Sequence, residues 1–275
     1  MHVAVVGHVE WVDFLHVERV PREGEIVQAD DAWQLAAGGG ADAAVQLLKL
    51  AGGATLFTAL GDDPLGRRAH DELRARALRL EVAWRDDPQR RAVCFLDADG
   101  ERTIALLGPK LVPHGSDPLP WHELDGADGV YFSGGDLGAL RAARRAKVLV
   151  ASARELHVLR EAGVELDVLV ASAADPGERY EGGLDPRPRY VVRTEGARGG
   201  VVEPGGRFPP GEPAGPLVDT YGAGDAFAAG LTYGLAAGMA IDEALALGAR
   251  CGATVLTGRG PYEAQLTAQE RLAKQ

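Results

Sequence analysis

Two aspartates that bracket a turn of small residues are the side chains best placed to do chemistry in this sequence. Residues 219–225 read Asp-Thr-Tyr-Gly-Ala-Gly-Asp, and apolar residues follow from Ala226 to Leu231. This pattern predicts a tight loop that opens into a buried helix. The first N–H groups of a helix have no intrahelical partner, so the turn could present them to an anion. Asp225 would stand in the first turn, where the helix dipole favours an ionised carboxylate that can accept a proton from a hydroxyl.

The same stretch also permits a plainer interpretation. A glycine-rich turn before an apolar helix is often only a tight entry into a core helix, and Asp225 would then be a capping carboxylate. Motifs this short also occur without function, so the turn alone favours neither interpretation.

Composition and charge exclude several classes of protein. The 275 residues are 46% hydrophobic, as in a soluble globular protein. The net charge of −11 argues against nucleic acid as a partner, whereas a nucleotide needs only a local site. We find neither a basic leader nor an apolar run of about 20 residues, so we expect a cytoplasmic protein that does not contact a membrane. Cys94 and Cys251 show no metal-ligand spacing and are expected to be buried thiols.

The N-terminus predicts a buried strand followed by a polar loop. Residues 3–6 are a short apolar run, as in a strand of a parallel sheet, and the loop expected after them carries His8, Glu10 and Asp13. Residues 14–33 mix apolar and charged side chains around a turn, which predicts a half-exposed pair of strands.

A run of glycines marks the start of the next helix. Residues 37–42 read Ala-Gly-Gly-Gly-Ala-Asp, and the helix expected after them ends at Gly52. Backbone without side chains could approach a ligand here, or the run could be a flexible hinge. The Gly-x-Gly-x-x-Gly spacing of a dinucleotide site is absent.

The following segment predicts a second buried strand, a capped helix and a hairpin. Residues 55–60 form the strand, and Asp63 can cap a helix that begins at Pro64. Residues 92–96 and 103–107 form the hairpin, which can pair with the strands near the N-terminus. Together these strands would make a small sheet that projects from the main body as a lid.

Strand and helix signals alternate in the second half of the chain. The expected elements are strands at 130–132, 148–151, 168–170 and 190–192, a helix near 155–161, and two apolar helices after residue 219 that are broken at Gly238. Such alternation indicates an α/β fold of three layers, α/β/α, around a mostly parallel sheet. We expect one domain, 1–275, with a β lid built from about residues 10–36 and 88–108.

With these motifs in view, the chain resembles the ribokinase-like, or PfkB, family of carbohydrate and nucleoside kinases. Residues 219–230 match the C-terminal signature of that family at each defining position. Segments 38–45, 61–66, 99–103 and 194–199 resemble its other motifs, in the family's order and over nearly the whole chain.

The resemblance implies ATP-dependent phosphorylation of a hydroxyl on a sugar, a nucleoside or a related small molecule. Asp225 would be the catalytic base. The turn formed by Gly222, Ala223 and Gly224 would be the anion hole for the transferred group. Phosphoryl transfer depends mostly on positioning and charge stabilisation, so an aspartate of low pKa that aligns the hydroxyl is adequate.

The resemblance also assigns ligand-binding residues. The acceptor would be bound by Asp13, Gly38, Gly39, Asp42 and Arg102, and ATP by Thr194, Gly196, Gly199, Ala253 and Gly258. Asp219 and Tyr221 stand where relatives can hold a monovalent cation such as K⁺, and Asp175 would be a ligand of Mg²⁺.

Three departures from the family pattern bear on activity. Asp42 stands where the family commonly has Asn, and an ionised Asp accepts hydrogen bonds but cannot donate them. The first loop is one residue longer than usual, so either Glu10 or Asp13 could contact the acceptor. The Asn-x-x-Glu motif that organises Mg²⁺ and phosphates appears at 172–175 as Ser-Ala-Ala-Asp.

These departures keep more than one function open. The chain is expected to be a kinase, with a sugar or a nucleoside as the acceptor. The alternative is a catalytically weak protein that binds a sugar or nucleoside as a sensor. The intact Asp225 favours an enzyme, because a binding module needs no base beside an anion hole. The edge strands of the lid could also pair between two copies and make a homodimer.

Overall fold

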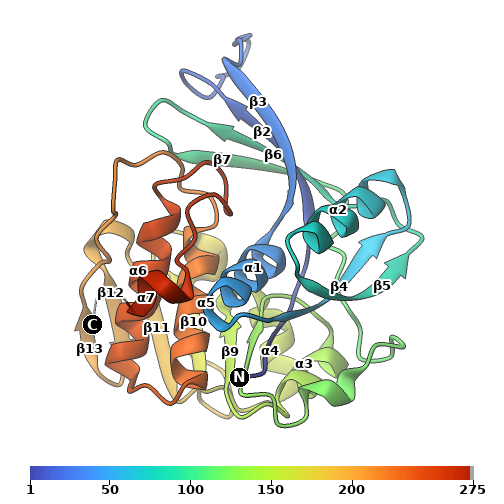
Figure 1. The fold of residues 1–275 in the computed structure, drawn as a ribbon, viewed down its shortest axis with the longest axis vertical. Coiled ribbons are helices and arrows are strands. Elements are labelled where there is room, and N and C mark those ends of the chain that lie inside the picture. The colour runs from blue at the N-terminus through green and yellow to red at the C-terminus, as the bar shows by residue number, and fades with distance from the viewer. Residues whose placement is uncertain (273–275) are drawn as a thin grey trace.

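Two sheets and the helices around the larger one make up the molecule (Figure 1). The structure is a computed structural model that describes residues 1–272. The larger sheet, sheet A, has the strand order β13-β12-β11-β10-β9-β8-β1-β4-β5 and is parallel except at β12 and β13. The smaller sheet, sheet B, has the order β3-β2-β6-β7 and lies above it. The expected three-layer α/β fold with a β lid is confirmed.

The elements run as follows along the chain. The strands are β1 (Val3–Val6), β2 (Glu10–His16), β3 (Asp31–Ala37), β4 (Thr55–Gly61), β5 (Arg79–Arg85), β6 (Arg91–Leu96), β7 (Arg102–Leu107), β8 (Gly129–Phe132), β9 (Leu149–Ser152), β10 (Val168–Ser172), β11 (Tyr190–Thr194), β12 (Gly200–Glu203) and β13 (Gly206–Phe208). The helices are α1 (Gly39–Ala51), α2 (Pro64–Ala75), α3 (Leu137–Ala143), α4 (Leu156–Ala162), α5 (Ala223–Ala236), α6 (Ile241–Val255) and α7 (Ala268–Leu272).

The central strand β1 explains why helices cover both faces of sheet A. Its side chains alternate between the faces, as in any strand. Val3 and Val5 pack in a core with residues of α1, α2, α5 and α6, whereas Ala4 and Val6 pack in a second core with α3 and α4. Both faces are therefore apolar, and the strand reads as a continuous hydrophobic run.

Helix ends follow from local sequence. The Asp63 carboxylate accepts a hydrogen bond from the Gly66 N–H at 2.8 Å, with Pro64 as the first residue of α2, as expected. Helix α1 ends at Gly52, which has φ of +76°. Helix α5 is buried over most of its length because it packs against α1, α6 and sheet A.

Sheet B joins the two strands that flank residues 17–30 to the hairpin of β6 and β7. Strand β2 pairs with β3 antiparallel and with β6 in parallel. The pairing of the hairpin with the N-terminal strands is confirmed. Phe14 packs edge-on against Tyr221 at a centroid distance of 4.9 Å. One face of sheet B therefore rests on the loop that precedes α5.

Several local expectations are wrong. Glu10 and Asp13 do not lie in a loop, because β2 begins at Glu10, after a connection of only three residues from β1. Strand β2 also begins four residues before the segment 14–33; its first residues are buried, whereas segment 14–33 itself is largely half-exposed or exposed, as expected. Strands β5 and β12 and helix α3 were not predicted.

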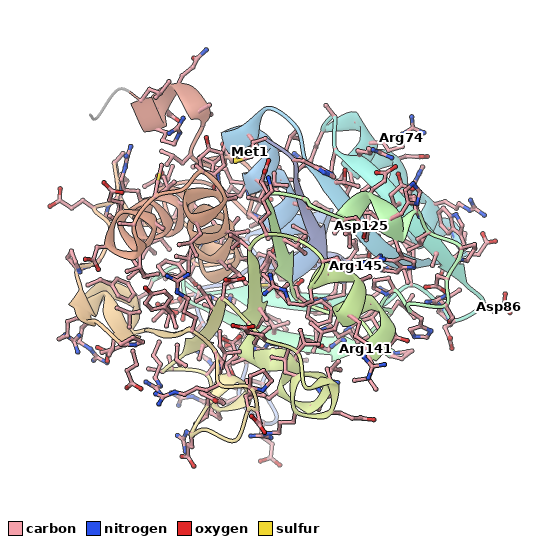
Figure 2. All side chains as sticks on the ribbon, turned by 90° about the horizontal axis from the view of Figure 1, so that it is seen from below. Met1, Arg74, Asp86, Asp125, Arg141 and Arg145 are labelled. Atoms are coloured by element: carbon pink, nitrogen blue, oxygen red, sulfur yellow. The ribbon has the colours of Figure 1, made fainter. Side chains whose placement is uncertain are left out.

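Charged side chains lie on the outside of the two helical layers. Seen from below, Arg74, Asp86 and Arg141 point away from the strands in the middle of the molecule (Figure 2). Among the described residues, no helix is both long and apolar enough to cross a bilayer.

Candidate active site

The turn that precedes α5 has the geometry expected of an anion hole. Gly222 has φ of +79°, a left-handed conformation that L side chains rarely adopt, and α5 begins at Ala223. A Cβ on Gly222 would lie 2.8 Å from the Cβ of Pro261. Both the backbone angle and the lack of space therefore require glycine. The first N–H groups of α5 have no intrahelical partner, and Asp225 stands among them in the first turn.

Helix α1 brings a second glycine-rich turn against the same carboxylate. A Cβ on Gly39 would lie 2.9 Å from Oδ1 of Asp225 and 3.4 Å from Cε1 of His8. Gly38 has φ of +100°, and a Cβ there would lie 3.3 Å from Cγ of Glu10. The packing of α1 on α5 thus places Gly38, Gly39 and Asp225 together, next to His8, which follows the carboxyl end of β1.

The pKa of Asp225 is raised to about 6, mainly by burial and further by the nearby carboxylate of Glu178. The guanidinium groups of Arg102 and Arg154 act in the opposite direction. The expected low pKa is therefore wrong, because desolvation outweighs the helix dipole. A group with this pKa is still mostly ionised at neutral pH and is a stronger base than an ordinary aspartate.

Asp42 lies on α1 and faces the same site. It is 1% exposed, and neither carboxyl oxygen has a hydrogen-bond partner among the described residues. Burial raises its pKa well above the ordinary value, and the charge of Asp225 adds to this. The structure thus brings Asp42 and Asp225 together, as expected.

Glu10 is placed at this site, whereas Asp13 is not. Asp13 accepts hydrogen bonds from Gln34 and from Arg91, the latter at 2.9 Å. It lies on the face of sheet B opposite to that of Phe14, which packs against Tyr221. Glu10, directly beside Gly38, forms an ion pair with Arg90 at 3.0 Å.

Arg102 reaches from sheet B to the loop that contains the turn. Its Nη1 donates a hydrogen bond to the backbone oxygen of Thr220 at 2.8 Å. The charge of Arg102 lowers the pKa of both Asp219 and Asp225. Within the described residues it makes no ion pair, so its charge is open to a ligand.

Asp219 ties the turn to the end of α6. Its carboxylate accepts hydrogen bonds from the N–H groups of Tyr221 at 2.7 Å and Gly260 at 2.8 Å. Burial raises its pKa despite these bonds. Both carboxylate oxygens are therefore engaged by backbone, and a monovalent cation would depend mostly on backbone oxygens nearby.

The residues expected to bind ATP fall into two groups beside this loop. Thr194 ends β11 and is followed by a turn in which Gly196 and Gly199 have φ of +59° and +77°. A Cβ on Gly199 would lie 2.1 Å from the Phe208 oxygen, so only glycine fits there. Ala253 is near the end of α6, and Gly258 lies three residues beyond that helix.

The carboxylate expected to bind Mg²⁺ is already occupied by protein groups. Asp175 accepts a hydrogen bond from the Gly177 N–H at 2.8 Å and pairs with Arg154. Arg154 also donates to Glu178 at 3.0 Å. A metal at Asp175 would have to displace Arg154. Among the described residues, no group of three or more His, Cys, Asp or Glu side chains could hold a metal ion.

Sequence reasoning missed several charged residues around Asp225. Arg154 follows β9, Glu178 lies beyond β10, and Lys110 follows β7 and pairs with Glu155. His8 was noted but given no role. Burial and the charges of Lys110 and Arg90 lower its pKa, so it is neutral. These residues follow the carboxyl ends of strands, and ligands bind at that edge of a parallel sheet. Their position after predicted strands could therefore have indicated that they belong to the site.

Comparison with known proteins identifies the family. The family model described as "pfkB family carbohydrate kinase" matches residues 1–157 and 139–268. An ATP-dependent ribose-1-phosphate kinase of Halopiger xanaduensis is 31% identical, over 96% of this chain and 95% of that protein.

Solved structures share the fold. A putative ribokinase from Agrobacterium tumefaciens aligns with a TM-score of 0.78 and 21% identity, over 99% of this chain and 96% of that one. An Arabidopsis thaliana ribokinase complexed with ribose and ATP aligns with a TM-score of 0.75 and 20% identity, over 98% and 97%. The chain therefore belongs to the PfkB family of carbohydrate kinases, has the ribokinase-like fold, and is a sugar or nucleoside kinase of that family.

Proposed function

We propose that this protein transfers the γ-phosphoryl group of ATP to a hydroxyl of a sugar, with Asp225 as the base. The observation that carries the proposal is the meeting of two glycine turns at one carboxylate. Gly222 opens α5 beside Asp225, and Gly39 at the start of α1 leaves no room for a side chain between them. A purely structural cap would not need the second turn.

The chemistry follows from this arrangement. The acceptor hydroxyl would lie within hydrogen-bond reach of Asp225, which takes its proton as the oxygen attacks the γ-phosphorus. The N–H groups at Gly222, Ala223 and Gly224, aided by the dipole of α5, would stabilise charge on the transferred group. Arg102 would add a positive charge from the lid. Burial of Asp225 supports this role, because it makes the carboxylate a stronger base.

ATP would lie along the carboxyl ends of β10 and β11. Thr194, Gly196, Gly199, Ala253 and Gly258 are the residues proposed to line it. When bound, Mg²⁺ would neutralise charge on the phosphates. Because Asp175 is paired with Arg154, we expect Glu178 and Asp175 to hold the metal largely through water. Asp219 and Tyr221 remain the proposed monovalent-cation site.

Among sugars, a phosphorylated pentose is the first acceptor to test. The ribose-1-phosphate kinase of Halopiger xanaduensis matches nearly the whole chain. Arg102 and Arg154 both act on the charge of Asp225, so cationic groups border the acceptor position and could face a phosphate. Asp42, Gly38, Gly39 and Glu10 would contact the sugar hydroxyls.

The test is a coupled assay of ADP release with Mg-ATP. Ribose-1-phosphate, ribose, fructose and inosine would be compared as acceptors. Asp225→Asn should lower turnover at least a thousandfold while acceptor binding, measured by calorimetry, changes little. The matched control is Asp128→Asn, which changes a carboxylate that is paired with Lys147 and takes no part in the proposed site. Ligand binding without turnover by the wild type would favour the sensor interpretation.

A further inference from the structure

The carboxyl group of Asp42 is buried without a partner in the middle of the site. The residue is 1% exposed, and both oxygens lack hydrogen bonds among the described residues. A Cβ on Gly222 would lie only 3.6 Å from Oδ2 of Asp42, so the carboxyl borders the proposed anion hole. Buried polar groups are usually paired, and among the described residues Asp42 is the only carboxyl group whose two oxygens are both buried and unpaired.

The groups that face Asp42 are all acids. Asp225 approaches from α5, Glu10 from β2, Tyr221 from the loop before α5, and Tyr262 from the loop after α6. The Tyr262 hydroxyl donates its hydrogen to the Ala36 oxygen at 2.8 Å. Tyr262 and the Gly38 backbone act to lower the pKa of Asp42, but burial and the charge of Asp225 outweigh them. Arg90, which precedes β6, is paired with Glu10.

An ionised Asp42 would have a high free energy in these surroundings. It would have lost its water, would lack a hydrogen bond of good geometry, and would stand opposite the charge of Asp225. Two carboxyls in one site normally keep one proton between them. Asp225 is less enclosed than Asp42 and is beside two guanidinium groups, so it is the member of the pair that ionises first.

We propose that Asp42 works as a neutral carboxylic acid, which donates a hydrogen bond to the acceptor oxygen beside Asp225 and keeps the carboxyl pair at a single negative charge. This inference rests on the proposed function. A protonated carboxyl has one donor and one acceptor, as an amide has, so it can replace the Asn that the family commonly carries at this position. One charge suits the site because a second would repel the arriving phosphoryl group.

Two variants of Asp42 distinguish the effect of its hydrogen-bond donor from the effect of its lack of charge. Asp42→Asn keeps a neutral donor of the same shape, and Asp42→Leu keeps neutrality but removes the donor. At neutral pH we expect kcat/KM of Asp42→Asn within about threefold of the wild type, and that of Asp42→Leu lower by about tenfold or more. In alkaline solution the wild type should lose activity as Asp42 ionises, whereas Asp42→Asn should not. Thermal denaturation and circular dichroism confirm that each variant is folded.

Infrared spectroscopy tests the proton without any turnover. The wild type minus Asp42→Asn difference spectrum at neutral pH should show the carbonyl band of a protonated acid. Absence of that band would overturn the inference, as would an Asp42→Asn enzyme as impaired as Asp42→Leu, because the ionised form would then be required. If no acceptor is phosphorylated by the wild type, the proposed function fails, and the infrared difference alone decides whether Asp42 is a neutral acid.

Discussion

The fall in activity at acid pH should report the pKa of the buried base, Asp225. The pKa of Asp225 is raised from 3.8 to about 6 by burial and by Glu178. The base is active only when ionised, and kcat/KM follows its ionisation before the substrate binds. Activity should therefore fall as pH drops through about 6.

The size of the effect follows from that pKa. With a pKa of about 6, roughly nine-tenths of Asp225 is ionised at pH 7 and about one-tenth at pH 5, so kcat/KM should fall about tenfold between them. With the ordinary pKa of 3.8, the carboxylate would remain more than about 90% ionised at pH 5, and activity would hardly change.

The assay is ADP release with a fixed acceptor, across this range at constant ionic strength. Glu178→Gln removes the charge that acts most on Asp225 and frees Arg154, so the midpoint should move to lower pH. The control is Glu203→Gln, because Glu203 is paired with Arg193 and does not act on Asp225. An acid limb with its midpoint near 4 in the wild type would refute the role of burial, and an unshifted midpoint in Glu178→Gln would refute the role of the Glu178 charge.

Three other perturbations have defined outcomes. Gly222→Ala puts a side chain at φ of +79° and against Pro261, so it should lower Tm and reduce turnover at least tenfold; unchanged kinetics would exclude the anion hole. Asp225→Asn removes a buried charge. Because the folded pKa is raised, wild-type stability should fall relative to this variant as pH rises from 4 to 6, by up to about 3 kcal/mol in urea unfolding, and parallel curves would contradict this. Asp63→Ala removes the cap of α2 and should cost about 1 kcal/mol in the same assay without changing kcat.

Local sequence determined most of the architecture. Continuous apolar runs predicted β1 and β4, because a strand covered on both faces needs apolar residues throughout. Asp63 with Pro64, and the glycine at position 52, set helix ends through contacts within a few residues. Strand β5 was not predicted because it lies at the edge of sheet A and is only partly buried. Charged residues interrupt its apolar ones, so the sequence shows no long apolar run there.

The sequence alone also indicated the reaction. Residues 219–225 carry the base and the turn together, since both belong to one loop and the first turn of one helix. Nothing beyond neighbouring residues is needed to place a carboxylate among free N–H groups.

Only the tertiary structure decided the protonation state of Asp225 and the residues that surround it. The high pKa of Asp225 arises from burial beneath α1 and from Glu178, which is distant in sequence. The register in which β2 pairs with β3 decides which face of sheet B each side chain occupies. In this register Glu10 lies toward the site and Asp13 lies away from it. Asp42 and Asp225 are 183 positions apart in the sequence and meet because α1 packs on α5. Desolvation and charge coupling depend on such contacts between distant segments, so no local pattern could have revealed them.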